Sequence, residues 1–156
     1  MSVAGGGGVS SGGPVSEEVL QREEWLRAEV EAFRDHPALL AWYISDEPTG
    51  HNMPPEALEQ SYRVVRELDP YHPISIVFMA PQRAGEYAGG MDVVMTDPYP
   101  IPHNPPDFVA AAVRAITDVF EPAKPVWLVP QAFGGNEWWT REPTAREQRV
   151  MTYLGI

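Results

Sequence analysis

Apolar residues follow two spacings along the chain, one typical of helices and one typical of buried strands. Short apolar runs, most of them bounded by proline, predict strands at 38–48, 73–79, 92–97 and 125–131. Helical spacing predicts helices at 16–35, 54–69, 106–120 and 144–153, with a helical turn at 82–88. Strands that alternate with helices in this way indicate an α/β fold with a parallel sheet.

The helices carry their own boundary signals. Ser16 and Thr144 are suited to cap the first and last helices, because a hydroxyl can accept from the unpaired N–H groups of the first turn. Pro54 or Pro55 suits the first turn of the second helix. The apolar residues expected to face the core from the first helix are Leu20, Trp25, Leu26, Val30 and Phe33.

Length and composition suggest how these elements are organised. Residues 1–15 are rich in glycine and serine, which predicts a flexible segment, and residues 16–156 are expected to form a catalytic domain. The alternation of strands and helices leaves two architectures open, a stretch of a barrel and a small doubly wound sheet. A whole (β/α)8 barrel takes about 250 residues, and the chain stops after a helix, where another strand is expected. We therefore predict parallel β/α units of a partial TIM (β/α)8 barrel, truncated at both ends.

The charge and apolar content exclude several partners. The net charge is -11, and the few lysine and arginine residues form no run, so nucleic acid is not an expected partner. No apolar run approaches the ~20 residues of a membrane span, so no membrane partner is expected. The absence of cysteine excludes disulfides and thiolate metal sites.

Polar and aromatic residues stand where the predicted strands end. The first strand ends in Asp46-Glu47-Pro48, the third in Asp97-Pro98-Tyr99, and the fourth in Gln131, with Asn136-Glu137-Trp138-Trp139 soon after. Parallel strands of a barrel bring such ends to one rim, which is where barrel enzymes place their active sites. We therefore expect these side chains to form a site.

Alternation along the first strand distinguishes Asp46 from Glu47. Neighbouring side chains on a strand point to opposite faces. Asp46 continues the bulky set of Leu40, Trp42 and Ile44, which should face the helices. Glu47 continues the smaller set of Ala41, Tyr43 and Ser45, so we expect it to face the barrel axis.

Three of the predicted strands resemble strands of a known family. The segment A-W-Y-I-S-D-E-P resembles the fourth strand of clan A glycoside hydrolases, which are retaining (β/α)8 enzymes. D-V-V-M-T-D-P-Y-P resembles their sixth strand and P-V-W-L-V-P-Q-A-F their seventh, so the resemblance covers roughly 37–153. It implies a glycosidase that cleaves O-glycosidic bonds of a carbohydrate substrate without a cofactor. It also implies that Glu47 is the general acid/base.

The chain departs from the pattern of that family at two positions. Asp46 stands where the clan usually has Asn, and Gln131 stands where it has the nucleophile. An amide cannot attack a sugar, and a retaining enzyme needs two carboxyl groups about 5 Å apart. Three alternatives follow: Glu137 is the nucleophile, the enzyme inverts with Glu47 and either Asp97 or Glu137, or the barrel binds sugar without hydrolysing it.

The other candidate residues have two roles each. Asp97, Tyr99 and Gln131 are expected to orient the sugar. The alternative for Asp97 and Tyr99 is that they only shape the turn between two prolines. The alternative for Gln131 is that it hydrogen-bonds loop backbone. Trp138 and Trp139 are expected to stack on the sugar, or else to belong to the core.

A further alternative is a metal-dependent hydrolase, with oxygen and nitrogen ligands. Its ligands would come from Asp46, Glu47, His51, Asp97 and His103. No His-x-x-x-His or similar spacing supports such a site, so no metal is expected.

Overall fold

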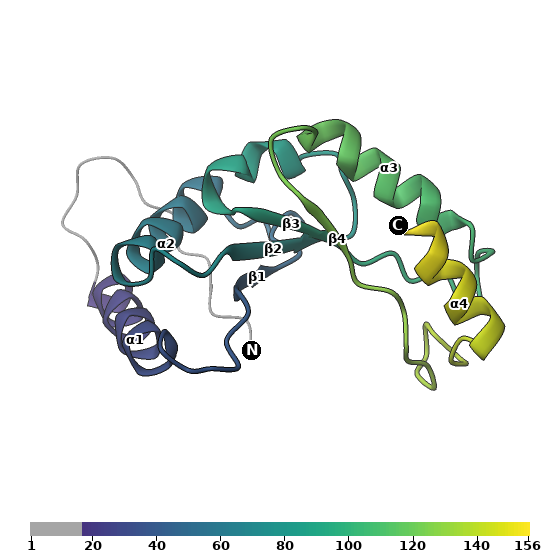
Figure 1. The fold of residues 1–156 in the computed structure, drawn as a ribbon, viewed down its shortest axis with the longest axis horizontal. Coiled ribbons are helices and arrows are strands. Elements are labelled where there is room, and N and C mark those ends of the chain that lie inside the picture. Colours follow the sequence, from purple (N-terminus) through teal and green to yellow (C-terminus); the bar gives the residue numbers. More distant parts are fainter. Residues whose placement is uncertain (1–16) are drawn as a thin grey trace. The chain divides into compact units, whose positions relative to one another are not determined.

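The computed structural model describes residues 17–156, so the predicted flexible segment and the Ser16 cap lie outside the described residues (Figure 1). The helices are α1 (Glu17–Phe33), α2 (Pro55–Leu68), the 3-10 helix η1 (Ala84–Gly90), α3 (Phe108–Phe120) and α4 (Ala145–Leu154). The strands are β1 (Trp42–Asp46), β2 (Ile74–Phe78), β3 (Val93–Thr96) and β4 (Val126–Leu128). They form an all-parallel sheet in the order β1-β2-β3-β4, which confirms the predicted α/β fold of parallel β/α units.

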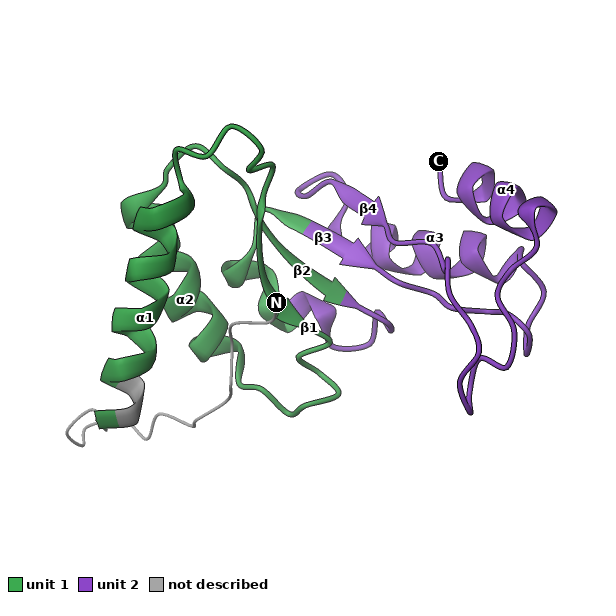
Figure 2. Cartoon of the chain, turned by 90° about the horizontal axis from the view of Figure 1, so that it is seen from below, with its two compact units in different colours: residues 1–77, 86–93 green, residues 78–85, 94–156 purple. Residues whose placement is uncertain are grey.

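The described chain divides into two compact units, shown in green and purple in Figure 2. Unit 1 comprises residues 17–77 and 86–93, and unit 2 comprises residues 78–85 and 94–156.

In unit 1, helices α1 and α2 pack against each other through part of the predicted apolar faces. Leu26 and Val30 of α1 and Leu58 and Val65 of α2 are buried. The apolar face of α1 is narrower than its sequence pattern predicts, because three of its expected core residues are 42–50% exposed. These are Leu20, Trp25 and Phe33.

Strand β1 is shorter than predicted, and its alternation is interrupted. It pairs with β2 in parallel, but the register shifts between Tyr43 and Ser45. An inserted residue of this kind reverses the order of inward and outward side chains. Ile44 and Ser45 are both buried, Leu40 lies before the strand and is 72% exposed, and the Tyr43 hydroxyl donates to Asp46 Oδ1 at 2.8 Å. Strict alternation was therefore the wrong basis for assigning Asp46 to the face opposite Tyr43.

In unit 2, β3 and β4 pair in parallel with Thr96 opposite Leu128. Ile101, Val109 and Met151 form a buried core cluster in this unit, and Val113 and Leu128 pack against it. Strand β4 is shorter than the predicted 125–131, since proline at both ends of the run lacks the N–H that a ladder needs.

Helix α4 begins with the predicted cap. The Thr144 hydroxyl accepts from the backbone N–H of Glu147, and the Glu147 carboxylate accepts in return from the backbone N–H of Thr144. At the other end of α4, the backbone at Gly155 lies directly against Leu128. A Cβ at position 155 would lie 2.1 Å from Leu128 Cδ2, so a larger residue here would have to displace the Leu128 side chain.

Candidate functional site

The predicted site residues are divided between the two units. Glu47 belongs to unit 1, whereas Asp97, Tyr99, Gln131, Glu137, Trp138 and Trp139 belong to unit 2.

Glu47 lies at the carboxyl end of β1 in a strained backbone conformation. Its N–H donates to the Val77 carbonyl at 3.2 Å, which extends the pairing with β2, and its own carbonyl accepts from Gly50 N–H at 3.0 Å. Its φ of 41° lies in the left-handed region, which residues with a Cβ rarely adopt. Such strain tends to persist at functional sites, where the surrounding structure holds it in place.

The surroundings of Glu47 favour its protonated form. Partial burial raises the pKa of the Glu47 carboxyl above its ordinary value, and the adjacent Asp46 carboxylate raises it further. His51 acts in the opposite direction. A carboxyl with a raised pKa is suited to give a proton to a leaving group and to take one back from water.

In unit 2, the chain segments that follow β3 and β4 lie together. Asp97 directly follows β3 and is buried, with an exposed fraction of 5%. Gln131 follows β4 and is fully buried. Its side chain hydrogen-bonds loop backbone, one of the two roles that the sequence left open for it: Oε1 accepts from Ile101 N–H, and Nε2 donates to the carbonyls of Ile101 and Phe133.

Three aromatic rings from the same two segments form a compact group, which we call the aromatic cluster: Tyr99, Phe133 and Trp139. Their centroids lie 4.9–5.7 Å apart, and every pair meets edge to face at 80–86°. This is a favourable geometry for ring pairs. The indole N–H of Trp139 also donates to the Tyr99 carbonyl at 3.2 Å. The rings thus pack on one another and leave no space between them for a ligand.

The two adjacent tryptophans have different environments. Trp139 belongs to the aromatic cluster, whereas the Trp138 side chain is 75% exposed. The Asn136 carboxamide oxygen accepts from the backbone N–H groups of both tryptophans, at 3.0 and 2.7 Å, and His103 Nε2 donates to the Trp138 carbonyl. Trp138 is therefore an exposed ring on a well-bonded loop, while Trp139 supports that loop.

Asn136 and Phe133 complete this site, although the sequence analysis gave them no role of their own. An asparagine that closes a turn on the N–H groups two and three residues ahead has a recognisable signal in the pattern N-E-W-W. Phe133 had no comparable signal, because one of its two ring neighbours, Tyr99, comes from the distant segment after β3. Glu137 lies between Asn136 and Trp138 with an exposed side chain.

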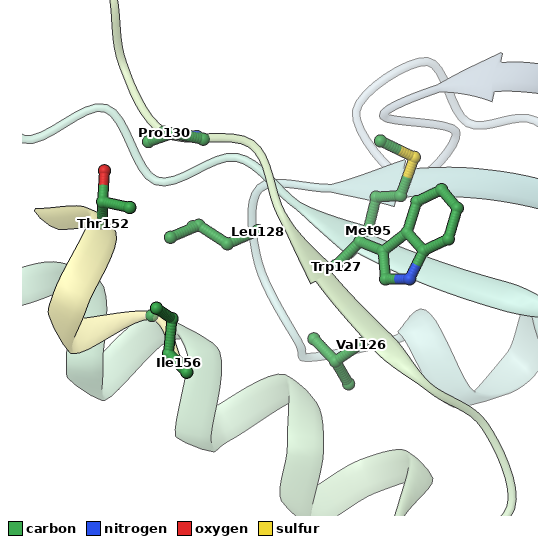
Figure 3. A pocket seen from close by; sticks show the side chains of 8 residues that line it. Met95, Val126, Trp127, Leu128, Pro130, Thr152 and Ile156 are labelled. Atoms are coloured by element: carbon green, nitrogen blue, oxygen red, sulfur yellow. The ribbon is translucent and has the colours of Figure 1, made fainter.

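A separate apolar pocket of about 390 Å³ lies beside β4 and the end of α4 (Figure 3). Met95, Trp127, Leu128, Thr152 and Ile156 are among the residues that line it. No acidic or basic side chain lines this pocket, so it offers no acid/base chemistry.

Two further kinds of element, a metal-ligand group and a membrane-spanning helix, are absent from the described residues. Within residues 17–156, no three acidic or histidine side chains are grouped so that they could hold a metal ion. In the same range, no helix has the length and apolar character needed to cross a membrane.

Comparison with known proteins relates the fold to glycosidases. The fold resembles that of a GH2 β-galacturonidase from Eisenbergiella tayi bound to galacturonate, with a TM-score of 0.56 and 22% identity over 74% of this chain and 22% of that chain. It also resembles a β-D-glucuronidase from Dictyoglomus thermophilum (TM-score 0.60, 17% identity, 86% and 26% covered). A β-glucuronidase from an uncultured Clostridium sp. gives a similar match (0.60, 15%, 87% and 26%).

These matches concern the fold of one part of much longer proteins. The chain spans about a quarter of the length of these glycosidases. No family model matches the sequence, and no curated protein matches it. The structural neighbours are nevertheless glycoside hydrolases, so the relation predicted from the sequence holds at the level of fold.

Proposed function

We propose that this chain is part of a clan A type (β/α)8 glycoside hydrolase and that Glu47 is its general acid/base. The observation that carries the proposal is the Glu47 carboxyl, whose pKa is raised at the carboxyl end of a parallel strand. Carboxyl ends of parallel strands are where such folds place their chemistry. The likeness in fold to GH2 glycosidases supports the same conclusion.

In the retaining form of this proposal Glu47 acts twice in one turnover. As an acid it gives its proton to the glycosidic oxygen while the bond between that oxygen and the anomeric carbon breaks. As a carboxylate it then takes a proton from the water that attacks the anomeric carbon. A raised pKa suits the first step, because the group must still hold its proton when the substrate binds.

A second carboxyl group is needed on the other side of the sugar. Gln131 is not that group, because its amide is neutral and bonded to loop backbone. We propose Glu137 for a retaining mechanism, since its side chain is exposed on the loop that carries Trp138. In an inverting mechanism, Asp97 or Glu137 would activate the water instead.

The substrate proposal rests on Trp138. An exposed indole on a well-bonded loop suits stacking on the apolar face of a sugar ring. Asp97 and Tyr99 are proposed to orient the sugar from the segment after β3. The named neighbours act on galacturonides and glucuronides, so these uronides are the first substrates to test.

The test compares leaving groups. The chain and its Glu47→Gln variant are assayed on alkyl and 2,4-dinitrophenyl glycosides of glucuronic acid, galacturonic acid, glucose and galactose. Loss of a general acid should lower kcat/KM on alkyl glycosides by about 10²–10⁴-fold. The loss should be much smaller on dinitrophenyl glycosides, because that leaving group needs no proton.

Glu56→Gln is the matched control, because Glu56 is an exposed acid in the first turn of α2. It should leave both substrate classes unaffected. Equal activity of Glu47→Gln and the unaltered chain on alkyl glycosides would exclude Glu47 as the acid. A chelator should have no effect, and inhibition by a chelator would favour the metal-dependent alternative.

A non-catalytic carbohydrate-binding barrel is the second candidate function. The observation that favours it is the buried amide of Gln131, which occupies the position where the resemblance puts the nucleophile. This alternative predicts sugar binding that survives Glu47→Gln and no turnover of any dinitrophenyl glycoside. Turnover by the unaltered chain that Glu47→Gln reduces would exclude it.

A further inference from the structure

Gln131 joins the two segments of unit 2 that follow β3 and β4. Its carboxamide exchanges two hydrogen bonds of 2.9 Å with the backbone of Ile101 and donates a third, of 3.1 Å, to the Phe133 carbonyl. Ile101 belongs to a buried core cluster of the unit, so one end of this connection is anchored.

The aromatic cluster connects the same two segments from the other side. Tyr99 lies two residues before Ile101, and Phe133 lies two residues after Gln131. The hydrogen bonds of Gln131 and the ring contacts therefore hold the same pair of backbones. Trp138, whose ring is exposed, directly precedes Trp139 of the cluster in the sequence.

The chemistry at position 131 requires an amide. Two carbonyl oxygens, of Ile101 and Phe133, face Nε2 and accept its hydrogens, while Oε1 accepts from an N–H. An ionised carboxylate has no hydrogen to donate. At this fully buried position it would face two carbonyl oxygens without compensation, which strongly disfavours the charged form.

We propose that Gln131 is a positioning residue that fixes the aromatic cluster and, through it, the orientation of Trp138. We also infer that this position does not accept an ionised nucleophile, so the second carboxyl group of the reaction comes from elsewhere in the protein. The part that concerns sugar binding rests on the function proposed above. A ring held in place before the ligand arrives loses less entropy on binding, so the fixed loop strengthens binding.

The test uses the full chain labelled with ¹⁵N at the tryptophan indoles. The Trp139 indole N–H is bonded to the Tyr99 carbonyl, and the indole ring packs against two other rings, so the N–H resonance reports on the cluster. Gln131→Met should move this resonance toward the position of an exposed indole at every pH. Gln131→Glu should do so at alkaline pH, where the carboxyl is forced to ionise, and should recover part of the native shift at lower pH, where a protonated carboxyl can donate to one carbonyl.

Kinetics on the glycoside that the unaltered chain hydrolyses provides the second readout. Gln131→Met should raise KM by about tenfold, the equivalent of one lost aromatic contact, with a much smaller change in kcat. A variant that merely unfolds a fraction of the protein would lower kcat and leave KM unchanged. Trp138→Ala should raise KM as well but leave the Trp139 resonance in place.

The two proposals fail in different ways. If no glycoside is hydrolysed or bound, the glycosidase proposal is wrong, while the Trp139 resonance still decides on the role of Gln131. An unchanged Trp139 resonance in Gln131→Met would overturn the positioning role. A Gln131→Glu variant whose Trp139 resonance stays native from pH 4 up to pH 10 would overturn the inference that an ionised group is not accepted.

Discussion

The buried carboxylate of Asp69 accepts a 2.9 Å hydrogen bond from the indole N–H of Trp42, which ties the end of α2 to the start of β1. The same carboxylate accepts from the backbone N–H groups of Tyr71 and His72 and lies 2.7 Å from the His72 ring. The turn between α2 and β2 is therefore organised around one negative charge. This arrangement is structural, and it makes the stability of unit 1 depend on pH.

Acid should destabilise the protein through Asp69. Burial by itself raises the pKa of Asp69, but the hydrogen bonds from Trp42, His72 and Tyr71 outweigh it and lower the pKa from 3.8 to about 2. A lowered pKa stabilises the fold fully above the unfolded value and loses this effect as pH falls from about 4 toward 2. The difference corresponds to about 2 kcal/mol.

Urea unfolding at pH 7, 4 and 2.5 measures this effect. Asp69→Asn should be less stable at pH 7 and should lose less stability than the unaltered chain between pH 4 and 2.5. Asp118→Asn removes an exposed carboxylate from α3 and serves as the control. Parallel pH curves for the unaltered chain and Asp69→Asn would show that Asp69 does not carry the effect.

The pH profile of catalysis should respond to the two charged neighbours of Glu47 in opposite directions. The Asp46 carboxylate raises the pKa of Glu47, whereas His51 lowers it. An acid must be protonated, so activity falls as pH rises through its pKa. Asp46→Asn should move the alkaline limb of kcat/KM to lower pH, and His51→Ala should move it to higher pH. Shifts of the same sign in both variants would contradict the assignment of Glu47.

The stability of the first turn of α4 should depend on its capping box. Thr144→Ala removes the hydroxyl that accepts from Glu147 N–H, and such a loss typically costs about 1 kcal/mol. Thermal unfolding should show a lower Tm for this variant. Thr140→Ala is the matched control, because Thr140 is exposed and lies before the helix. Equal losses in the two variants would mean that the capping box does not stabilise α4.

Two adjacent glycines in the Trp138 loop should differ sharply in their tolerance of alanine. A Cβ at Gly134 would lie 2.1 Å from the backbone of Arg141, so Gly134→Ala must open the loop. Gly135 has a φ of 89° with open space around it, so Gly135→Ala costs only local strain, about 1–2 kcal/mol. Near-ultraviolet circular dichroism should show loss of the aromatic signal in the first variant alone. A native aromatic signal in both variants would show that the backbone at Gly134 and the backbone at Arg141 can separate without disturbing the aromatic cluster.

The sequence by itself determined the order and type of the elements. Three kinds of signal were local: the helical spacing of apolar residues, a continuous apolar run such as Ile74–Phe78, and the Thr144 cap. Local signals act through the backbone of their own segment, so they can be read from the sequence. The strand ends that carry Glu47 and Gln131 were also visible, because proline marks where a ladder stops. The glycosidase-like fold was recognisable from this order of elements.

Only the tertiary structure decided what several of these residues do. The prediction from side-chain alternation along β1 failed at the register shift after Tyr43. That register is set by pairing with β2, which the sequence of β1 alone does not specify. The difference between Trp138 and Trp139 depends on Tyr99 and Phe133, which come from separate segments. Gln131 bonds Ile101, thirty residues away in sequence, and no periodicity reports such a partner. Hydrogen bonds and ring contacts form between whichever groups the folded chain brings together, so a residue's role at the strand ends follows from its distant neighbours.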